Sequence, residues 1–415
     1  MQRVSTNMSN DDMQYYARQR ESRLLNTQNQ IASQNRLQQL RDDPAAAAHA
    51  TRHSSYLYRL NRYSKNIETA QLRHRESEVY MQEAASILQR VRELALQGAQ
   101  GTYTREDTRA MAAEVNQLLN QLLESANAKG GDGAMLFAGD RTQSAPFRAI
   151  TGRVEGFGEP VVAQVQYLGT ISENRTEIAE GSYIPLNFAG NKVFWAENQQ
   201  VYSSVDATGY LVQEDTVIFV DGQEVQLRSG DSISAIIAKI NDSGAPVRAR
   251  LDPVQNSLVI ESTSPHQLWL DEGEDSRVLR DLGILSERRG APPLNIASSA
   301  RVFGGSMFDT LINLRDRLAA GDTINTGGRA LGGIDSALDN LLGRLGTLGS
   351  FDERLQLAFQ RTRSTIPQIT ARYSNEVDVD MAEAITDLRM LEHTHRAALG
   401  AAARIIQPTL LDFLR

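Results

Sequence analysis

Histidine pairs are the first residues of this chain whose type and spacing could do chemistry. His49 and His53 lie four residues apart in a stretch expected to be helical, and that spacing can present two ligands to a metal. The sequence offers no third ligand nearby and no adjoining Glu as in a zinc protease, which favours a solvated or interface pair. His393 and His395 would point to different faces of a later helix, where His395 fits an interface polar group.

Two further patterns could bind ions. Asp271, Glu272, Glu274 and Asp275 are close together, but their spacing is not that of a calcium loop, which favours an acidic surface loop. The glycines over residues 327–333 are not followed by the Gly-Lys-Ser/Thr of a phosphate loop, which favours a bend before a helix. The chain has no cysteine and no Ser in a nucleophile elbow. We therefore expect no enzyme, no cofactor and no metal.

Charge is spread unevenly along the 415 residues, whose net charge is −8. Residues 1–75 hold 12 Arg and Lys against 6 Asp and Glu, whereas residues 151–300 hold 11 against 21. The arginines form no basic stripe and no aromatic stacking platform, so no nucleic-acid site is expected. No run of about 18 apolar residues predicts a membrane span. The amino terminus also lacks the apolar core of a signal peptide, so export would need another route.

The stretch from Val377 to Ile405 must position any functional surface near the carboxyl end. Its apolar residues recur every three or four positions, which predicts one stripe on one side of a helix. Burying its four largest apolar side chains is worth roughly 6–12 kcal/mol, comparable to the stability of a typical domain. The helix therefore needs a partner from the other chain end or from another subunit. The predicted subunit-assembly residues are Leu24, Ile31, Met381, Leu388, Leu391, His395, Ala398, Ala402 and Ile405.

The other chain end offers a counterpart. Residues 13–40 predict a polar helix with a thin apolar stripe, which is marginal alone. Asp43 and Pro44 then suit the N-cap and first position of a new helix. Its pattern runs to Gly98 and Gly101, and some fifty residues at about 1.5 Å each predict a rod of roughly 80 Å. Such a length is typical of a coiled coil or fibre.

The helical character continues in two places. Thr104 should cap a third helix before a Gly turn and a short apolar strand over residues 135–139. Phe308 should begin the return helices, with Gly321 as a stop. A long apolar phase then starts at Leu331 and joins the carboxyl-terminal stripe, with Pro367 expected to bend or interrupt it.

Residues 140–300 change to short β-rich runs punctuated by Gly and Pro. Thr216–Val220 and Gln223–Leu227 flank Asp221-Gly222, a strong hairpin signal. Ser232 should cap a short helix ending at Asn241, and a second hairpin should follow. Its strands are predicted over Val247–Leu251 and Leu258–Glu261. Further strands are predicted over Val161–Leu168, Ile184–Phe188 and Lys192–Trp195.

Several motifs carry a family resemblance. The run from Ile31 through Ser33 to Arg41-Asp42-Asp43-Pro44-Ala45 resembles the amino-terminal signature of bacterial flagellins and hook-associated proteins. Gln34 stands where that family usually has Gly. Other runs resemble the junction protein between hook and filament, the hook-associated protein 3 family: Arg92–Ala95, Glu114-Val115, Ser125–Asn127, Leu136–Gly139, Asp378–Ala384 and Thr409–Leu414. The order of 216–261 resembles an insert of flagellin-type outer domains.

The expected fold is mainly α with a β-rich insertion: long paired terminal helices, a coiled-coil-like rod, carry a central β-rich outer domain. The expected parts are an N-terminal assembly helix (1–43), two halves of the rod (44–139 and 301–375), the outer domain (140–300) and a C-terminal assembly helix (376–415).

The resemblance implies a structural subunit of the bacterial flagellum that joins hook to filament and folds its terminal helices on assembly. The implied partners are other copies in a ring, the first junction protein, flagellin, the flagellar export apparatus and an export chaperone. The implied location is the flagellum after export by the flagellar secretion system, extracellular or, if the flagella are internal, periplasmic. Two alternatives stay open: a flagellin-type filament subunit and a surface binding module in the central domain.

Overall fold

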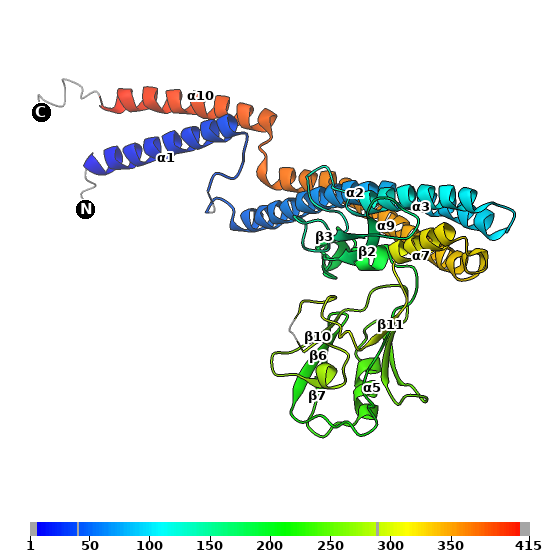
Figure 1. The fold of residues 1–415 in the computed structure, drawn as a ribbon. Coiled ribbons are helices and arrows are strands. Elements are labelled where there is room, and N and C mark those ends of the chain that lie inside the picture. Colours follow the sequence, from blue (N-terminus) through cyan, green and yellow to red (C-terminus); the bar gives the residue numbers. More distant parts are fainter. Residues whose placement is uncertain (1–5, 40, 288–289, 407–415) are drawn as a thin grey trace, which may run out of the picture. The chain divides into compact units, whose positions relative to one another are not determined.

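The computed structural model describes residues 6–39, 41–287 and 290–406. The chain divides into two compact units, one made of residues 1–65 and 359–415 and the other of residues 66–358. The helices are α1 (Thr6–Ser33), α2 (Pro44–Ala99), α3 (Arg105–Ala126), α4 (Gly190–Val193), α5 (Ile233–Asp242), α6 (Val278–Asp281), α7 (Met307–Ala320), α8 (Thr323–Asn325), the π-helix η1 (Thr326–Ala330), α9 (Leu331–Val377) and α10 (Met381–Ile406) (Figure 1).

The strands all lie between α3 and α7 and form small antiparallel sheets. They are β1 (Phe147–Gly152), β2 (Val161–Tyr167), β3 (Arg175–Ala179), β4 (Ser182–Pro185), β5 (Gln200–Tyr202), β6 (Thr216–Val220), β7 (Gln223–Leu227), β8 (Val247–Leu251), β9 (Leu258–Ser262), β10 (Leu270–Glu272) and β11 (Arg301–Phe303). The sheet orders are β1-β2, β3-β4, β10-β6-β7 and β11-β5-β9-β8. The predicted fold class, mainly α with a β-rich insertion, is confirmed.

The unit of residues 66–358 contains a helical core. The apolar stripes of α2, α3, α7 and α9 meet there, and α3 packs along α7. Local sequence explains the helix ends. Thr104 and Asp107 bond each other's backbone N–H groups in a capping box, and Gly321 ends α7 at φ 77°, a left-handed conformation that glycine adopts without strain. The predicted start and stop signals at these residues are confirmed.

The same unit contains a β-rich lobe with its own core, formed by residues between Val201 and Leu285. The predicted hairpin is confirmed: β6 pairs with β7, and the turn residues Asp221 and Gly222 both have positive φ, at 48° and 78°. Positive φ at both central residues is the mark of the tight turn that matches strand twist. The second hairpin, β8 with β9, and the helix after Ser232 also lie where predicted, but the Ser232 side chain makes no capping hydrogen bond.

Three predicted strands are wrong. Residues 135–139 form two isolated bridges, because Leu136 and Phe137 are both buried in the helical core and Gly139 turns the chain at φ 68°. The predicted strand over 192–195 overlaps helix α4, with Trp195 in an isolated bridge to Ser306. The strand predicted over 184–188 ends already at Pro185, which has no N–H to donate.

The sequence predicts that Pro367 bends or interrupts the long apolar phase; helix α9 runs through it without interruption, so the predicted interruption is wrong. Pro367 removes the N–H that would bond the carbonyl of Arg363. Both residues are exposed, so water can bond that carbonyl and the helix continues. The actual break comes later, at residues 378–380, which separate α9 from α10.

Candidate assembly site on the terminal helices

Helices α1 and α10 lie side by side although they come from opposite ends of the sequence (Figure 1). The carboxylate of Asp380 fixes the start of α10, because its Oδ1 accepts the N–H groups of Ala382 at 2.9 Å and Glu383 at 3.2 Å. This is the side-chain cap that a helix beginning needs. Because α1 packs against α10, the predicted pairing of the two chain ends is confirmed.

The pairing covers only one face of each helix. Ala384 is the single buried side chain of α10 among those that the structure describes, and α1 has none. Met390 is 61% exposed and Leu399 51% exposed, and other large apolar groups of the pair are exposed as well. They are Tyr15, Tyr16, Leu25, Met381 and Ile385. The helix pair therefore carries apolar surface that no described part of this chain covers.

A short backbone connection, here called the terminal clamp, joins residues 34–36 to residues 376–379. The N–H of Arg36 donates to the carbonyl of Val377 at 2.7 Å, and the N–H of Val379 donates to that of Gln34 at 3.1 Å. The guanidinium of Arg36 adds a bond to the carbonyl of Glu376 at 2.9 Å. The clamp ties the chain leaving α1 to the chain entering α10.

Gln34 has φ 59°, the left-handed conformation that favours glycine. The bend that the family resemblance associates with glycine is therefore present here with glutamine. Its side chain is exposed, so the side chain adds no packing that would offset the backbone strain.

The predicted assembly residues fall into three groups. Leu24, Ile31, Leu388, Leu391, His395 and Ala398 are half-buried, and Met381 is exposed. Ala402 and Ile405 belong to the α10 backbone, but their side chains lie outside the described residues. Sequence reasoning missed the clamp residues Arg36 and Gln34; the departure from glycine at position 34 was the available signal.

Two of the candidate histidines belong to this site, since His395 lies on α10 and His49 contacts the terminal clamp. His49 Nδ1 lies 3.5 Å from Glu376 Oε1, an interface contact within the same unit. Within the described ranges, no cluster of three or more His, Asp or Glu side chains could hold a metal ion. No helix in the described ranges combines the length and apolarity that crossing a membrane requires.

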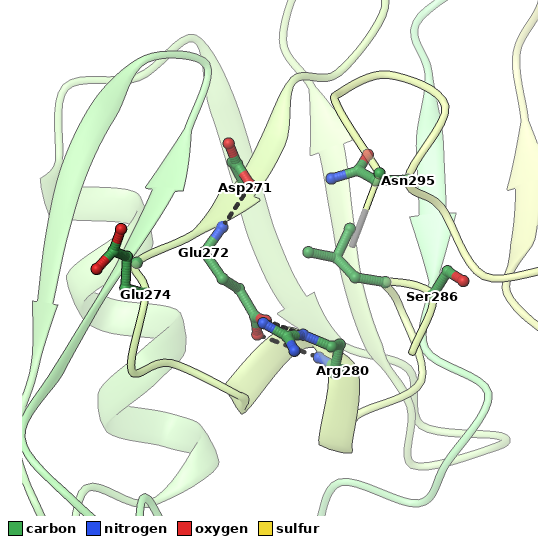
Figure 2. Close-up of a pocket in the computed structure, with 9 residues that line it drawn as sticks. Asp271, Glu272, Glu274, Arg280, Ser286 and Asn295 are labelled. Carbon is green, nitrogen blue, oxygen red and sulfur yellow. Dashed lines mark hydrogen bonds and ion pairs between the residues drawn. The ribbon is translucent and has the colours of Figure 1, made fainter. Parts of the chain in front are cut away.

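The acidic run at 271–275 is not simply a surface loop, which corrects that prediction. The side chain of Glu272 is 2% exposed and accepts hydrogen bonds from the Nε of Arg280 at 2.7 Å and from the backbone N–H of Leu279. Figure 2 shows this pair beside a cavity of about 180 Å³ lined by Asp271 and Asn295. Ligand pockets measure about 300–1,000 Å³, so this cavity is smaller than a typical one.

Comparison with known protein families gives three matches along the chain. Residues 4–142 match the bacterial flagellin N-terminal helical region, 217–264 the flagellin hook IN motif and 331–414 the bacterial flagellin C-terminal helical region. Flagellin E of Vibrio cholerae is 24% identical over 422 residues, spanning 99% of this chain and 98% of that protein. Flagellar hook-associated protein 3 of Escherichia coli is 29% identical over 124 residues, 30% of this chain and 39% of that protein.

Among solved structures, hook-associated protein 3 of Legionella pneumophila covers 78% of this chain and 97% of its own, with a TM-score of 0.46 and 18% identity. Paired terminal helices around a β-rich insertion, with three matches in this order, define a structural protein of the flagellin type. The chain belongs to the flagellin family of bacterial flagellar proteins.

Proposed function

We propose that this chain is a structural subunit that joins the hook of the bacterial flagellum to its filament. The observation that carries the proposal is the apolar surface left uncovered on α1 and α10. A subunit that stands alone has no use for such a surface, whereas a subunit in a continuous tube covers it with its neighbours. The assembly helices are proposed to be residues 1–43 and 376–415.

The junction position is supported by the segment Leu136–Gly139. Leu136 and Phe137 are buried in the helical core, and a Cβ on Gly139 would lie 2.4 Å from the carbonyl oxygen of Thr170. The segment therefore tolerates little change, and its sequence resembles the junction family. Hook-associated protein 3 of Escherichia coli and of Salmonella typhimurium, 27% identical over 142 residues, are also among the relatives.

The mechanism we propose is folding coupled to assembly. Met390 and Leu399 are 61% and 51% exposed, so covering either one stabilises a complex by about 1–2 kcal/mol, roughly half the value for full burial. Ordering the helix ends costs conformational entropy, which the burial offsets only when a neighbour is present. The half-buried residues between α1 and α10 would hold the pair together, and the exposed ones would bind the neighbouring subunits.

The partners follow from the position in the flagellum. Further copies would form a ring, the first junction protein would lie on one side and flagellin on the other. The subunit would leave the cell through the flagellar export apparatus with an export chaperone. Its role would be purely structural, without catalysis.

A deletion strain tests the proposal. Loss of the gene should leave hooks without filaments and release flagellin into the medium, and the wild-type chain should restore filaments. The double variant Met390→Ser/Leu399→Ser should be made and exported but should fail to restore them, since both side chains are exposed and their loss leaves the fold intact. Val254→Ser, which removes an exposed apolar group from the β-rich lobe, is the control. Full filaments with the double variant would contradict the proposed surface.

A filament subunit is the second candidate, because similarity to Flagellin E runs over almost the whole chain. The two candidates differ in self-assembly. A filament subunit should polymerise alone into long filaments, whereas a junction subunit should give monomers or short rings. Electron microscopy of the purified chain distinguishes them.

A further inference from the structure

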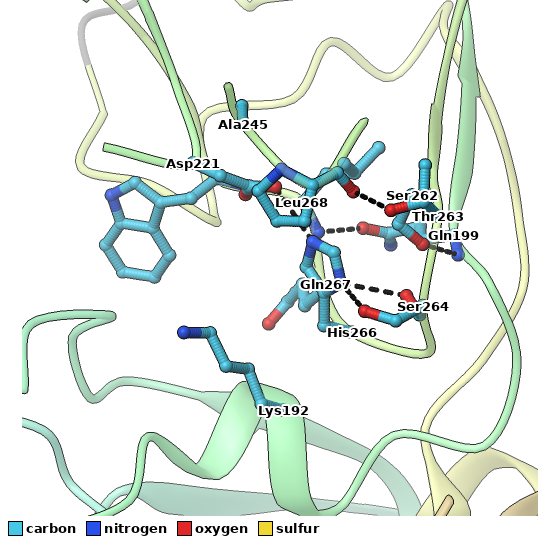
Figure 3. Close-up of polar contacts among 12 residues, drawn as sticks. Lys192, Gln199, Asp221, Ala245, Ser262, Thr263, Ser264, His266, Gln267 and Leu268 are labelled. Carbon is cyan, nitrogen blue, oxygen red and sulfur yellow. Dashed lines mark hydrogen bonds and ion pairs between the residues drawn. The ribbon is translucent and has the colours of Figure 1, made fainter. Parts of the chain in front are cut away.

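A histidine and an aspartate form a buried pair in the β-rich lobe, far along the chain from the assembly helices. The side chains of His266 and Asp221 are 2% and 7% exposed, and Nε2 lies 2.8 Å from Oδ2. The other ring nitrogen, Nδ1, lies 2.8 Å from the backbone carbonyl oxygen of Ser264. Figure 3 shows the imidazole held between these two groups.

The two contacts define the proton positions. A backbone carbonyl oxygen can only accept a hydrogen bond, so Nδ1 must carry a proton. A carboxylate also only accepts, so Nε2 must carry one too. The other oxygen of Asp221, Oδ1, accepts the N–H of Trp269 at 2.8 Å. With Asp221 as the carboxylate, the imidazolium is the form of the ring that makes both hydrogen bonds.

The same contacts exclude a nucleophilic serine. Ser264 Oγ lies 3.3 Å from Nδ1, so Ser264, His266 and Asp221 superficially resemble a catalytic set. A general base needs a free nitrogen to take the hydroxyl proton. Nδ1 already donates to the carbonyl oxygen, so it cannot serve as that base.

The pair lies where the lobe is attached to the helical core. Asp221 occupies the tip of the β6–β7 hairpin, and His266 belongs to the loop of residues 263–269 that leads into β10. In that loop Gln267 exchanges two hydrogen bonds with Asn191, both at 3.1 Å. Trp269 packs against the helical core.

We propose that His266 is a proton-dependent latch that holds this loop, and with it the lobe, on the helical core. Protonated, it donates to the hairpin and to its own loop at once. When the ring loses a proton as the pH rises, one of the two bonds is lost and the loop loosens. The latch is therefore present when the ring carries both protons and is lost when the ring gives one up at higher pH.

The charged groups around the latch act in opposite senses. Asp221 from the hairpin favours the imidazolium. Lys192 of α4 disfavours it, but its Nζ is paired with Glu173 at 3.2 Å. Arg344 of α9 donates to the carbonyl oxygen of Pro265 at 3.4 Å, beside the loop. Asp221 is the charged group in direct contact with the ring, so its effect on the imidazolium outweighs that of Lys192.

Two measurements on the full-length chain test the latch. Nitrogen NMR of the histidine rings should show both nitrogens of His266 protonated at about pH 6. Amide hydrogen exchange should show the opening of the Trp269 N–H, corrected for its intrinsic rate, increasing about tenfold towards about pH 8.5, as expected for one lost charge-assisted bond. An unprotonated ring nitrogen at the lower pH would overturn the inference without any variant.

Variants separate the latch from other histidines. Asp221→Asn preserves a residue type that tolerates positive φ but removes the charge, so the opening should be faster at low pH and independent of pH. His266→Gln should behave alike, and His393→Gln on the exposed surface of α10 should leave the wild-type pH dependence unchanged. An unaltered pH dependence in both Asp221→Asn and His266→Gln would overturn the proposal.

Discussion

Replacing Gln34 by glycine should tighten the terminal clamp. A non-glycine residue in the left-handed conformation costs about 1–2 kcal/mol. Glycine removes this cost but loses about 0.5–1 kcal/mol more conformational entropy on folding. The exposed Gln34 side chain contributes no packing that would be lost. The net gain of about 0.5–1 kcal/mol should slow opening of the clamp about two- to fivefold.

Amide hydrogen exchange on the full-length chain measures this opening directly. The N–H groups of Arg36 and Val379 donate across the clamp and report on it from both sides. Asn35→Gly is the matched control, because Asn35 is the next residue and does not have a positive φ. There glycine brings only its entropic cost, so exchange should become faster. Gln34→Val should be worse than wild type, since β-branched residues tolerate positive φ poorly.

The two glycine variants must move the exchange rate in opposite directions. If Gln34→Gly accelerates exchange as Asn35→Gly does, Gln34 is not strained and the left-handed bend does not exist in solution. The clamp would then not be what ties α1 to α10. Equal rates in all variants would mean that these amides exchange by a wider unfolding, which denaturant dependence would reveal.

Two further predictions concern the helical core. Arg315 is fully buried and donates to the carbonyl of Val162 at 2.6 Å. Arg315→Met should therefore lower the free energy of unfolding, measured in urea, by about 1–3 kcal/mol. Arg329 is exposed, so Arg329→Met should leave it unchanged. Burial lowers the pKa of His74, whose bond to Pro185 opposes the shift only in part. The unfolded chain then binds a proton first as the pH falls, so stability should drop below about pH 6.5 and His74→Gln should flatten that dependence.

Local signals in the sequence predicted what depends on a few neighbouring residues. The β6–β7 hairpin needed only Asp221-Gly222 between two β-rich runs, and α2 begins at Pro44 with Asp43 Oδ1 accepting the N–H of Ala46 at 3.0 Å. The apolar stripes of α1 and α10 indicated that the chain ends pair, because a single helix cannot cover its own apolar stripe.

Local signals could not predict features that depend on residues far apart in the sequence. The run at 135–139 has strand-like composition, but the core formed by α2, α3 and α7 surrounds it. Arg315 looked like an ordinary helix position, yet it donates to Val162, which lies 153 residues away in the sequence. The contact of His266 with Asp221 likewise joins two residues that are 45 positions apart in the sequence.

The contrast between α3 and α10 carries the functional argument. Both helices have an apolar stripe, and α3 buries its stripe against several neighbours, with Met111, Val115, Leu119 and Leu122 all buried. α10 has α1 as its packing partner, and two paired helices can cover only the faces that they turn toward each other. Within the part of the chain that the structure describes, nothing else covers the remaining apolar groups. A water-exposed apolar surface of this extent is unfavourable, and this is the physical basis on which we propose that the terminal helices assemble with neighbouring subunits.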